Sequence, residues 1–140
     1  MSRTEFVRNN GFACETSSSS WSFPDHQNRR ILIGAWDDLI DQSNLRALVL
    51  GNESIWRQQA NGRPNPHWGE TREHIRLVDE LSYELFVYRM VCLNLAEAQG
   101  GRAREIAYFS HEVLPVDLAS DVENWWATFR HPLPAMVLQG

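Results

Sequence analysis

The pattern of apolar and polar positions is most informative in residues 21–37. This stretch has an aromatic run, a polar turn at residues 24–28 and then a β-branched apolar run. Aromatic and β-branched runs on both sides of a Pro, Asp and Asn cluster are typical of a β-hairpin. We therefore predict a hairpin with one strand over 12–23 and its partner over 29–36, and we take it as the centre of the fold.

Three further segments have clear patterns. Residues 4–10 suit a short helix, with Ser2 as its N-cap and Gly11 as its end. Residues 45–50 (LRALVL) are a short apolar run between turn residues, which is typical of a buried strand. Residues 70–81 form the clearest helix, because apolar residues recur at helical spacing and acidic residues occupy the first turn.

The segment 82–98 allows two interpretations. Its apolar residues fit a heptad stripe, which would continue the preceding segment as one long helix, but the same residues are dense in aromatic and β-branched types. Gly100 and Gly101 form a hairpin-type turn. We favour a hairpin with strands over 84–95 and 104–113.

The remaining segments complete the expected fold. They are turns or loops at 37–44, 60–69 and 113–121, a helical turn at 53–59, and a final strand or short helix at 124–129. We predict a single α+β domain over 1–130, with a twisted, mainly antiparallel sheet and one principal helix. A tail or linker follows over 131–140.

Charge and composition narrow the classes of function. The net charge of −5 argues against broad binding to polyanions, although it allows a local basic face. All 13 lysine and arginine positions are arginine, which excludes a P-loop lysine, a Schiff-base lysine and a lysine-dependent nuclease core. Arginine also suits forked contacts with phosphates and base edges. The sequence has neither an apolar run long enough for a bilayer nor a secretory signal, so we expect a cytoplasmic protein without membrane contact.

The sequence offers two candidate catalytic or metal sites, and neither is complete. Glu70 and His74 share a helix face near His67, which gives half of a metal site, but a solvated helix start accounts for the same residues. The run Ser-His-Glu at 110–112 cannot form a hydrolase triad, because adjacent residues on a strand point to opposite faces. We expect no catalytic residue, no metal and no cofactor.

Six tryptophans in 140 residues suggest another kind of site. Most fit core packing, and the alternative is a pocket whose aromatic walls hold a flipped base. Asp37 beside Trp36 suits the role of reader, because a carboxylate can accept a hydrogen bond from the amino group of cytosine. In that case Trp21 and Trp36 are the walls, while Arg63 and Arg72 hold phosphates from the loop and the helix start.

Several short motifs occur in an order that resembles a known domain. The motifs GFAC, SWSF, ILIGAWD, ALVL, GRPNP and TREHIRLVDE, followed by an aromatic strand, extend over about residues 10–113. This order resembles the N-terminal domain of McrA-type HNH restriction endonuclease proteins, which are modification-dependent enzymes of bacteria. The resemblance implies a domain that senses DNA, often modified cytosine, beside an HNH domain that cuts it. The matching positions are Trp21, Phe23, His26, Trp36, Asp37, Arg63, Arg72, Glu73 and His74.

This chain departs from that pattern because it contains no HNH nuclease, with neither a CxxC pair nor a His-His core. The resemblance therefore implies a reader domain at most, or a fragment of a longer protein. We expect a non-catalytic recognition domain for modified double-stranded DNA, for example DNA with 5-methylcytosine, in a restriction or defence context. Its partner would be a fused or separate HNH nuclease. The alternative, which the acidic balance favours, is an immunity or complex-assembly subunit that binds protein and no nucleic acid.

Overall fold

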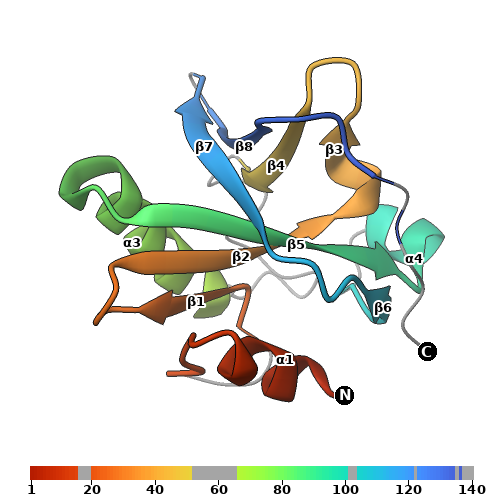
Figure 1. Ribbon diagram of the computed structural model, residues 1–140. Helices are drawn as coiled ribbons and strands as arrows, with labels where there is room; N and C mark the ends of the chain where they lie inside the picture. The colour runs from red at the N-terminus through yellow and green to blue at the C-terminus, as the bar shows by residue number, and fades with distance from the viewer. Residues whose placement is uncertain (16–19, 52–65, 101–103, 122, 135, 137–140) are drawn as a thin grey trace.

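The computed structural model describes residues 1–15, 20–51, 66–100, 104–121, 123–134 and 136. Its elements are α1 (Arg3–Asn9), β1 (Ser22–Asp25), β2 (Arg30–Trp36), the 3-10 helix η1 (Asp37–Leu39), β3 (Ile40–Asp41), β4 (Arg46–Leu50), α3 (Pro66–Leu81), β5 (Glu84–Cys92), α4 (Leu95–Gln99), β6 (Ile106–Phe109), β7 (Leu114–Ser120) and β8 (Trp125–Phe129). Within the described residues, eight strands form one mixed sheet, and most of its pairs are antiparallel (Figure 1). The expected α+β class, with α3 as the principal helix, is confirmed.

The predicted hairpin lies at one edge of the sheet, where β1 and β2 pair antiparallel. Its turn covers residues 26–29 instead of 24–28, so Pro24 and Asp25 belong to the strand. The predicted helix before it is also confirmed as α1. The Ser2 hydroxyl accepts a hydrogen bond from an N–H of its first turn, and Gly11 follows the end of α1 with a φ of +88°, which favours glycine.

The prediction of a strand from residue 12 to residue 21 was wrong wherever these residues are described. Phe12 is buried against α1, so its apolar character reflects core packing instead of strand pairing. The Ala13 N–H does donate a hydrogen bond to the Pro24 carbonyl (2.8 Å), but the described residues around Ala13 do not pair with β1 as a strand. A single hydrogen bond of this kind leaves β1 as the edge strand.

The central strand of the sheet is β5, the longest strand, which crosses the molecule in Figure 1. It runs parallel to β2 over seven residues, from Glu84 opposite Arg30 to Met90 opposite Trp36. Its other side pairs antiparallel with β7 near its start and with β6 near its end. The sheet then continues from β7 through β8 and β4 to β3.

The favoured hairpin of residues 84–95 and 104–113 is confirmed only in part. β5 and β6 do pair antiparallel, but they are connected through α4, and Gly100 caps that helix instead of forming a tight turn. The alternative of one long helix was wrong. α3 ends at Leu81, because Ser82 has a φ of +58° and breaks the helical path.

Residues 113–121, predicted to be a loop, contain strand β7. Proline weakens a strand only where its missing N–H would pair. Pro115 lies opposite β5, and β8 begins to pair with β7 only at Val116, so Pro115 has a strand on one side only. The final segment, left open between strand and helix, is strand β8.

The principal helix begins earlier than predicted. α3 starts at Pro66, so residues 66–69 of the predicted loop are helical. Proline fits the first turn of a helix, since the N–H it lacks would have no helical partner there. The helical turn predicted at 53–59 and the rest of the loop lie outside the described residues. None of the helices in the described part of the chain is both long and apolar enough to cross a bilayer.

Alternation along β2 and β5 creates two cores, one on each face of the sheet. The first, which we call the α3 core, is formed around helix α3 by the odd-numbered residues of these strands together with β4, β7 and β8. The second, the α1 core, is formed by the even-numbered residues with α1. Strands near both ends of the sheet, β2 and β4, contribute residues to the α3 core, so the sheet curls around it.

Candidate functional site

The two predicted aromatic walls, Trp21 and Trp36, pack on opposite faces of the sheet. Trp21 precedes β1 and packs against the α3 core, with its ring centroid 6.1 Å from that of His67. Trp36 packs against the α1 core, and the Arg104 guanidinium lies 5.1 Å from its ring centroid. The two tryptophans therefore do not enclose one pocket, and a binding role for either one separately stays a prediction.

Two other predicted residues belong to the protein interior. Phe23 is buried in the α1 core. His74, on the inward face of α3, is also buried, and its Nδ1 lies 2.6 Å from the Ser22 hydroxyl. The Ser22 hydroxyl also bonds the buried Thr71 hydroxyl (3.2 Å), so a small polar network joins α3 to the first strand of the hairpin.

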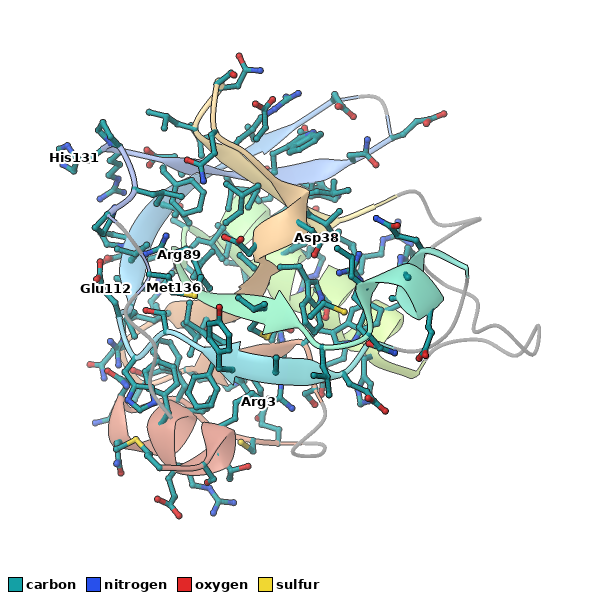
Figure 2. All side chains as sticks on the ribbon, turned by 90° about the vertical axis from the view of Figure 1, so that its right-hand side faces the viewer. Arg3, Asp38, Arg89, Glu112, His131 and Met136 are labelled. Carbon is teal, nitrogen blue, oxygen red and sulfur yellow. The ribbon has the colours of Figure 1, made fainter. Side chains whose placement is uncertain are left out.

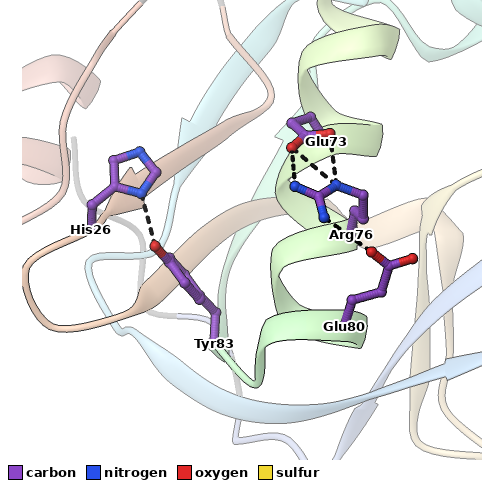
Figure 3. A network of polar contacts seen from close by, with 5 residues as sticks. All are labelled: His26, Glu73, Arg76, Glu80 and Tyr83. Atoms are coloured by element: carbon purple, nitrogen blue, oxygen red, sulfur yellow. Dashed lines mark hydrogen bonds and ion pairs between the residues drawn. The ribbon is translucent and has the colours of Figure 1, made fainter.

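The outer end of this network includes His26, in the hairpin turn. Its Nδ1 bonds the Tyr83 hydroxyl at 3.0 Å (Figure 3). The Glu15 carboxylate lies 3.5 Å from the Nε2 of His26 and 3.9 Å from the Nε2 of His74. Sequence reasoning placed both histidines in one site, and the structure does bring them together around Glu15.

Ser22, His74 and Glu15 are the residue types of a hydrolase triad, but their environment is that of a structural contact. The Ser22 residue is only 1% exposed, and it is covered by α3, so a substrate could not reach its hydroxyl. We interpret the network as the polar contact that orients α3 on the hairpin. It needs hydrogen bonds because a buried polar group without one is costly.

The burial of His74 makes the stability of the protein depend on pH. Burial lowers the pKa of His74 below its ordinary value, although the nearby carboxylates of Glu70 and Glu15 oppose this effect. Near the ordinary pKa of histidine, His74 therefore binds a proton more readily in the unfolded chain than in the folded protein. The free energy of unfolding rises with pH in this range. We expect the free energy of unfolding to fall as the pH is lowered from 7 to 5, by at most about 1.4 kcal/mol per pH unit for one proton.

Urea unfolding at pH 7, 6 and 5 measures this dependence. His74→Asn is the matched variant, because its amide can still bond Ser22 but does not titrate. The difference in pH dependence between wild type and His74→Asn gives the contribution of His74 separately from that of the other histidines. An equal pH dependence in both proteins would show that His74 is not responsible.

The suggested half metal site does not become a full one. Among the described residues, no group of three His, Cys, Asp or Glu side chains is arranged to hold a metal ion. His67 Nδ1 and the Glu70 carboxylate lie 3.9 Å apart at the start of α3, while His74 is directed to Ser22 and Glu15.

A cavity of about 290 Å³ lies at the ends of the two parallel strands. Asp37 follows the last residue of β2, while Arg89 and Val91 lie near the end of β5, and Tyr108 on β6 is paired with Val91. Their side chains line the cavity because the sheet pairing brings these ends together. Among the described residues, the lining consists of Asp37, Gln42, Arg89, Val91, Tyr108, Leu133, Pro134 and Met136.

The C-terminal segment lines part of this cavity, which we call the Asp37 cavity. Leu133, Pro134 and Met136 supply apolar lining, and Leu133 also packs against the α3 core. Figure 2 labels Arg89 and Met136, two of the lining residues. The lining thus combines polar side chains, apolar side chains and one aromatic ring.

Asp37 is one of the residues predicted from the sequence to belong to a site, whereas Arg89 is not. A signal for it was present, because Leu85, Val87, Arg89 and Val91 occupy alternate positions of one strand. A charged residue within such an apolar stripe is a candidate for function, since arginine is almost never fully buried unless it is paired. Tyr108 and Met136 carry no such signal in the sequence.

Five of the ten arginines in the described residues form ion pairs with carboxylates. Arg76 lies between Glu73 (2.6 Å) and Glu80 (3.0 Å) on the exposed face of α3 (Figure 3). Other ion pairs join Arg30 to Asp25, Arg46 to Asp41, Arg104 to Asp38 and Arg130 to Asp117. Arg72 is exposed on α3, 5.5 Å from the Trp68 ring centroid, and the predicted Arg63 lies outside the described residues.

The comparisons with known proteins identified no similar protein or family. A scan of protein families, a search of curated proteins and a search of solved structures each found no match. The resemblance to McrA-type proteins therefore rests on the order of the sequence motifs alone.

Proposed function

We propose that this chain is a non-catalytic recognition domain for modified DNA, and that it holds one extruded base in the Asp37 cavity. The observation that carries the proposal is that Asp37, singled out as a base reader from the sequence, lines this cavity. Enzymes and readers that act on a base take it out of the duplex into a pocket and read its edge there. In the cell such a domain would work beside a fused or separate HNH nuclease in restriction or defence, in the cytoplasm.

The size of the cavity supports a small planar ligand. Its volume of about 290 Å³ is near the lower limit of ligand pockets, which is about 300 Å³. A single base fits this scale better than a large cofactor does. Tyr108 supplies a ring against which a base can stack, in place of the predicted pair of tryptophans.

The lining also suits 5-methylcytosine in particular. The amino group and the methyl group of this base occupy adjacent positions on its ring. A carboxylate can accept from the amino group, and apolar side chains can contact the methyl group. The cavity is lined by both kinds of group, the Asp37 carboxylate and the apolar side chains of Val91, Leu133 and Met136.

Binding of a duplex is tested by fluorescence anisotropy with 5-methylcytosine and plain duplexes at several salt concentrations. Asp37→Ala should abolish the preference for the modified duplex, a loss of about 1–3 kcal/mol, and leave non-specific binding nearly intact. Arg72→Ala should instead weaken binding to every duplex and reduce the salt slope by about one. The exposed Asp79 on α3 provides the matched control, since Asp79→Ala makes the same change of charge away from the cavity.

A protein-interaction subunit is the second candidate, and the ion pairs favour it. Arginines that are bound to carboxylates are less available to phosphates, and the net charge is −5. If neither modified nor plain DNA binds more tightly than about 100 μM at low salt, where even non-specific DNA binders are detectable, the DNA proposal is wrong. A protein partner would then be the better explanation.

A further inference from the structure

Arg89 is a buried arginine whose side chain has no ion pair or hydrogen-bond partner among the described residues. The residue is 4% exposed, and its Nε is a buried donor with no hydrogen bond. Within the described residues, no carboxylate forms an ion pair with Arg89, and no side-chain hydrogen bond joins it to another group. Buried charges in proteins are almost always paired, because an unpaired one costs several kcal/mol.

The position of Arg89 explains how it can face the cavity. It lies on β5 between Val87 and Val91, on the face of the α3 core, and its neighbour on the parallel strand β2 is Ala35. The small alanine side chain leaves room beside the guanidinium. Arg89 therefore supplies hydrogen-bond donors to the cavity whose rim carries the Asp37 carboxylate, an acceptor.

We propose that Arg89 determines which base the cavity accepts, by donating hydrogen bonds to the ring nitrogen N3 and the carbonyl oxygen O2 of cytosine. This inference rests on the proposed function. Asp37 accepts from the amino group at C4 of the same base, so the two side chains match the donor–acceptor–acceptor edge of cytosine. The base would also give Arg89 the hydrogen-bond partner that the described part of the chain does not provide.

The same pair of side chains rejects the other bases. Thymine and guanine present a carbonyl oxygen where cytosine has its amino group, and this oxygen would face the Asp37 carboxylate. Adenine has an amino group but carries a C–H where cytosine has O2, and it is larger. The methyl group of thymine is in the same place as that of 5-methylcytosine, so thymine is the most demanding competitor.

The test uses duplexes that are identical except at one position and otherwise contain only A·T pairs. That position carries 5-methylcytosine·G, cytosine·G or T·A. Wild type should bind the 5-methylcytosine duplex about ten to one hundred times more tightly than the T·A duplex, the range expected for good base contacts. Arg89→Met should bring this ratio close to one, because methionine fills similar space without donors.

Two further measurements separate a binding role from a structural one. The Tm of Arg89→Met should equal or exceed that of wild type, since the substitution removes an unpaired buried charge. Arg89→Lys should discriminate less than wild type, because a lysine is a point donor without the fork. Arg130→Met, which removes a charge paired with the exposed Asp117, is the matched control and should keep the wild-type ratio.

The outcomes distinguish the inference from the function on which it rests. If wild type binds these duplexes but Arg89→Met keeps the preference for 5-methylcytosine over thymine, the inference is wrong and the proposed function stands. The inference is also wrong if Arg89→Met melts several degrees below wild type. If wild type binds the 5-methylcytosine and T·A duplexes equally, both the inference and the reading of the amino group by Asp37 are wrong. If wild type binds none of the duplexes, both proposals are wrong.

Discussion

Replacing Val49 with aspartate is expected to unfold the protein. Val49 is 4% exposed and lies in β4, where the strand bulges and packs into the α3 core. An aspartate there would be a charge without a partner among apolar side chains. Such a charge costs several kcal/mol, which is a large part of the total stability of about 5–15 kcal/mol for a domain.

The neighbouring Leu48 provides the control for this variant. Leu48 is half-buried and is paired with Trp126 outside the α3 core. Leu48→Asp should therefore keep a cooperative unfolding transition and lose less stability than Val49→Asp. Circular dichroism with thermal and urea unfolding measures both variants, and a cooperative Val49→Asp protein with a Tm within a few degrees of wild type would show that β4 is not part of the core.

The second large effect is expected for Arg30→Ala. Arg30 donates from Nε and Nη2 to the buried Asp25 carboxylate at 2.9 and 2.8 Å, and from Nη2 to the Asn10 carbonyl at 3.0 Å. Its guanidinium also lies 4.5 Å from the ring centroid of Phe12. The residue thus connects the hairpin to the end of α1.

Removing Arg30 leaves the Asp25 carboxylate buried, with Asn28 as its one remaining side-chain donor among the described residues. Loss of one partner of a buried pair costs about 3–5 kcal/mol. We expect about 3 kcal/mol for Arg30→Ala, because the Arg30 side chain is partly exposed and the Asn28 hydrogen bonds remain. Arg30→Met keeps the apolar contact with Phe12 and should lose somewhat less.

The pH dependence of the stability loss in Arg30→Ala tests whether the buried Asp25 carboxylate causes that loss. Burial alone would raise the pKa of Asp25, but hydrogen bonds from Asn28 and Arg30 outweigh burial and hold the pKa below its ordinary value. This stabilisation is present above the ordinary pKa and is lost as the pH falls through the folded-state value. The deficit of Arg30→Ala should therefore shrink between pH 7 and pH 3 in urea unfolding, and an equal deficit at both pH values would point to packing instead.

Local features of the fold were predictable because their signals lie within a few residues. The hairpin and the helix cap at Ser2 depend on contacts between near neighbours. The cap is found as predicted, and the hairpin forms between 22–25 and 30–36, with a first strand shorter than predicted. Prolines were misinterpreted because their effect depends on the surroundings. Pro115 lies within a strand, because the neighbouring strand β8 does not pair with β7 at this position. Pro66 is the first residue of a helix instead of part of a loop.

The candidate site was predictable only in part, because its residues meet through pairing between distant strands. Asp37 was found from its own chemistry, beside an aromatic residue. Trp21 and Trp36 belong to one hairpin, yet a bend before β1 and the alternation along β2 direct them to different cores. Arg89 becomes informative only when β5 is recognised as a strand and its apolar stripe is traced.

The central position of β5 also determines how this chain must fold. The hairpin can form by itself, but β2 finds its second neighbour only when Arg30 meets Glu84, far along the chain. Closing so long a loop before other contacts compensate makes folding slow, as in other proteins of high contact order. During synthesis on the ribosome, the inner edge of β2 stays open until β5 has emerged. Until then, this apolar edge is the part of the nascent chain most prone to pair with another molecule.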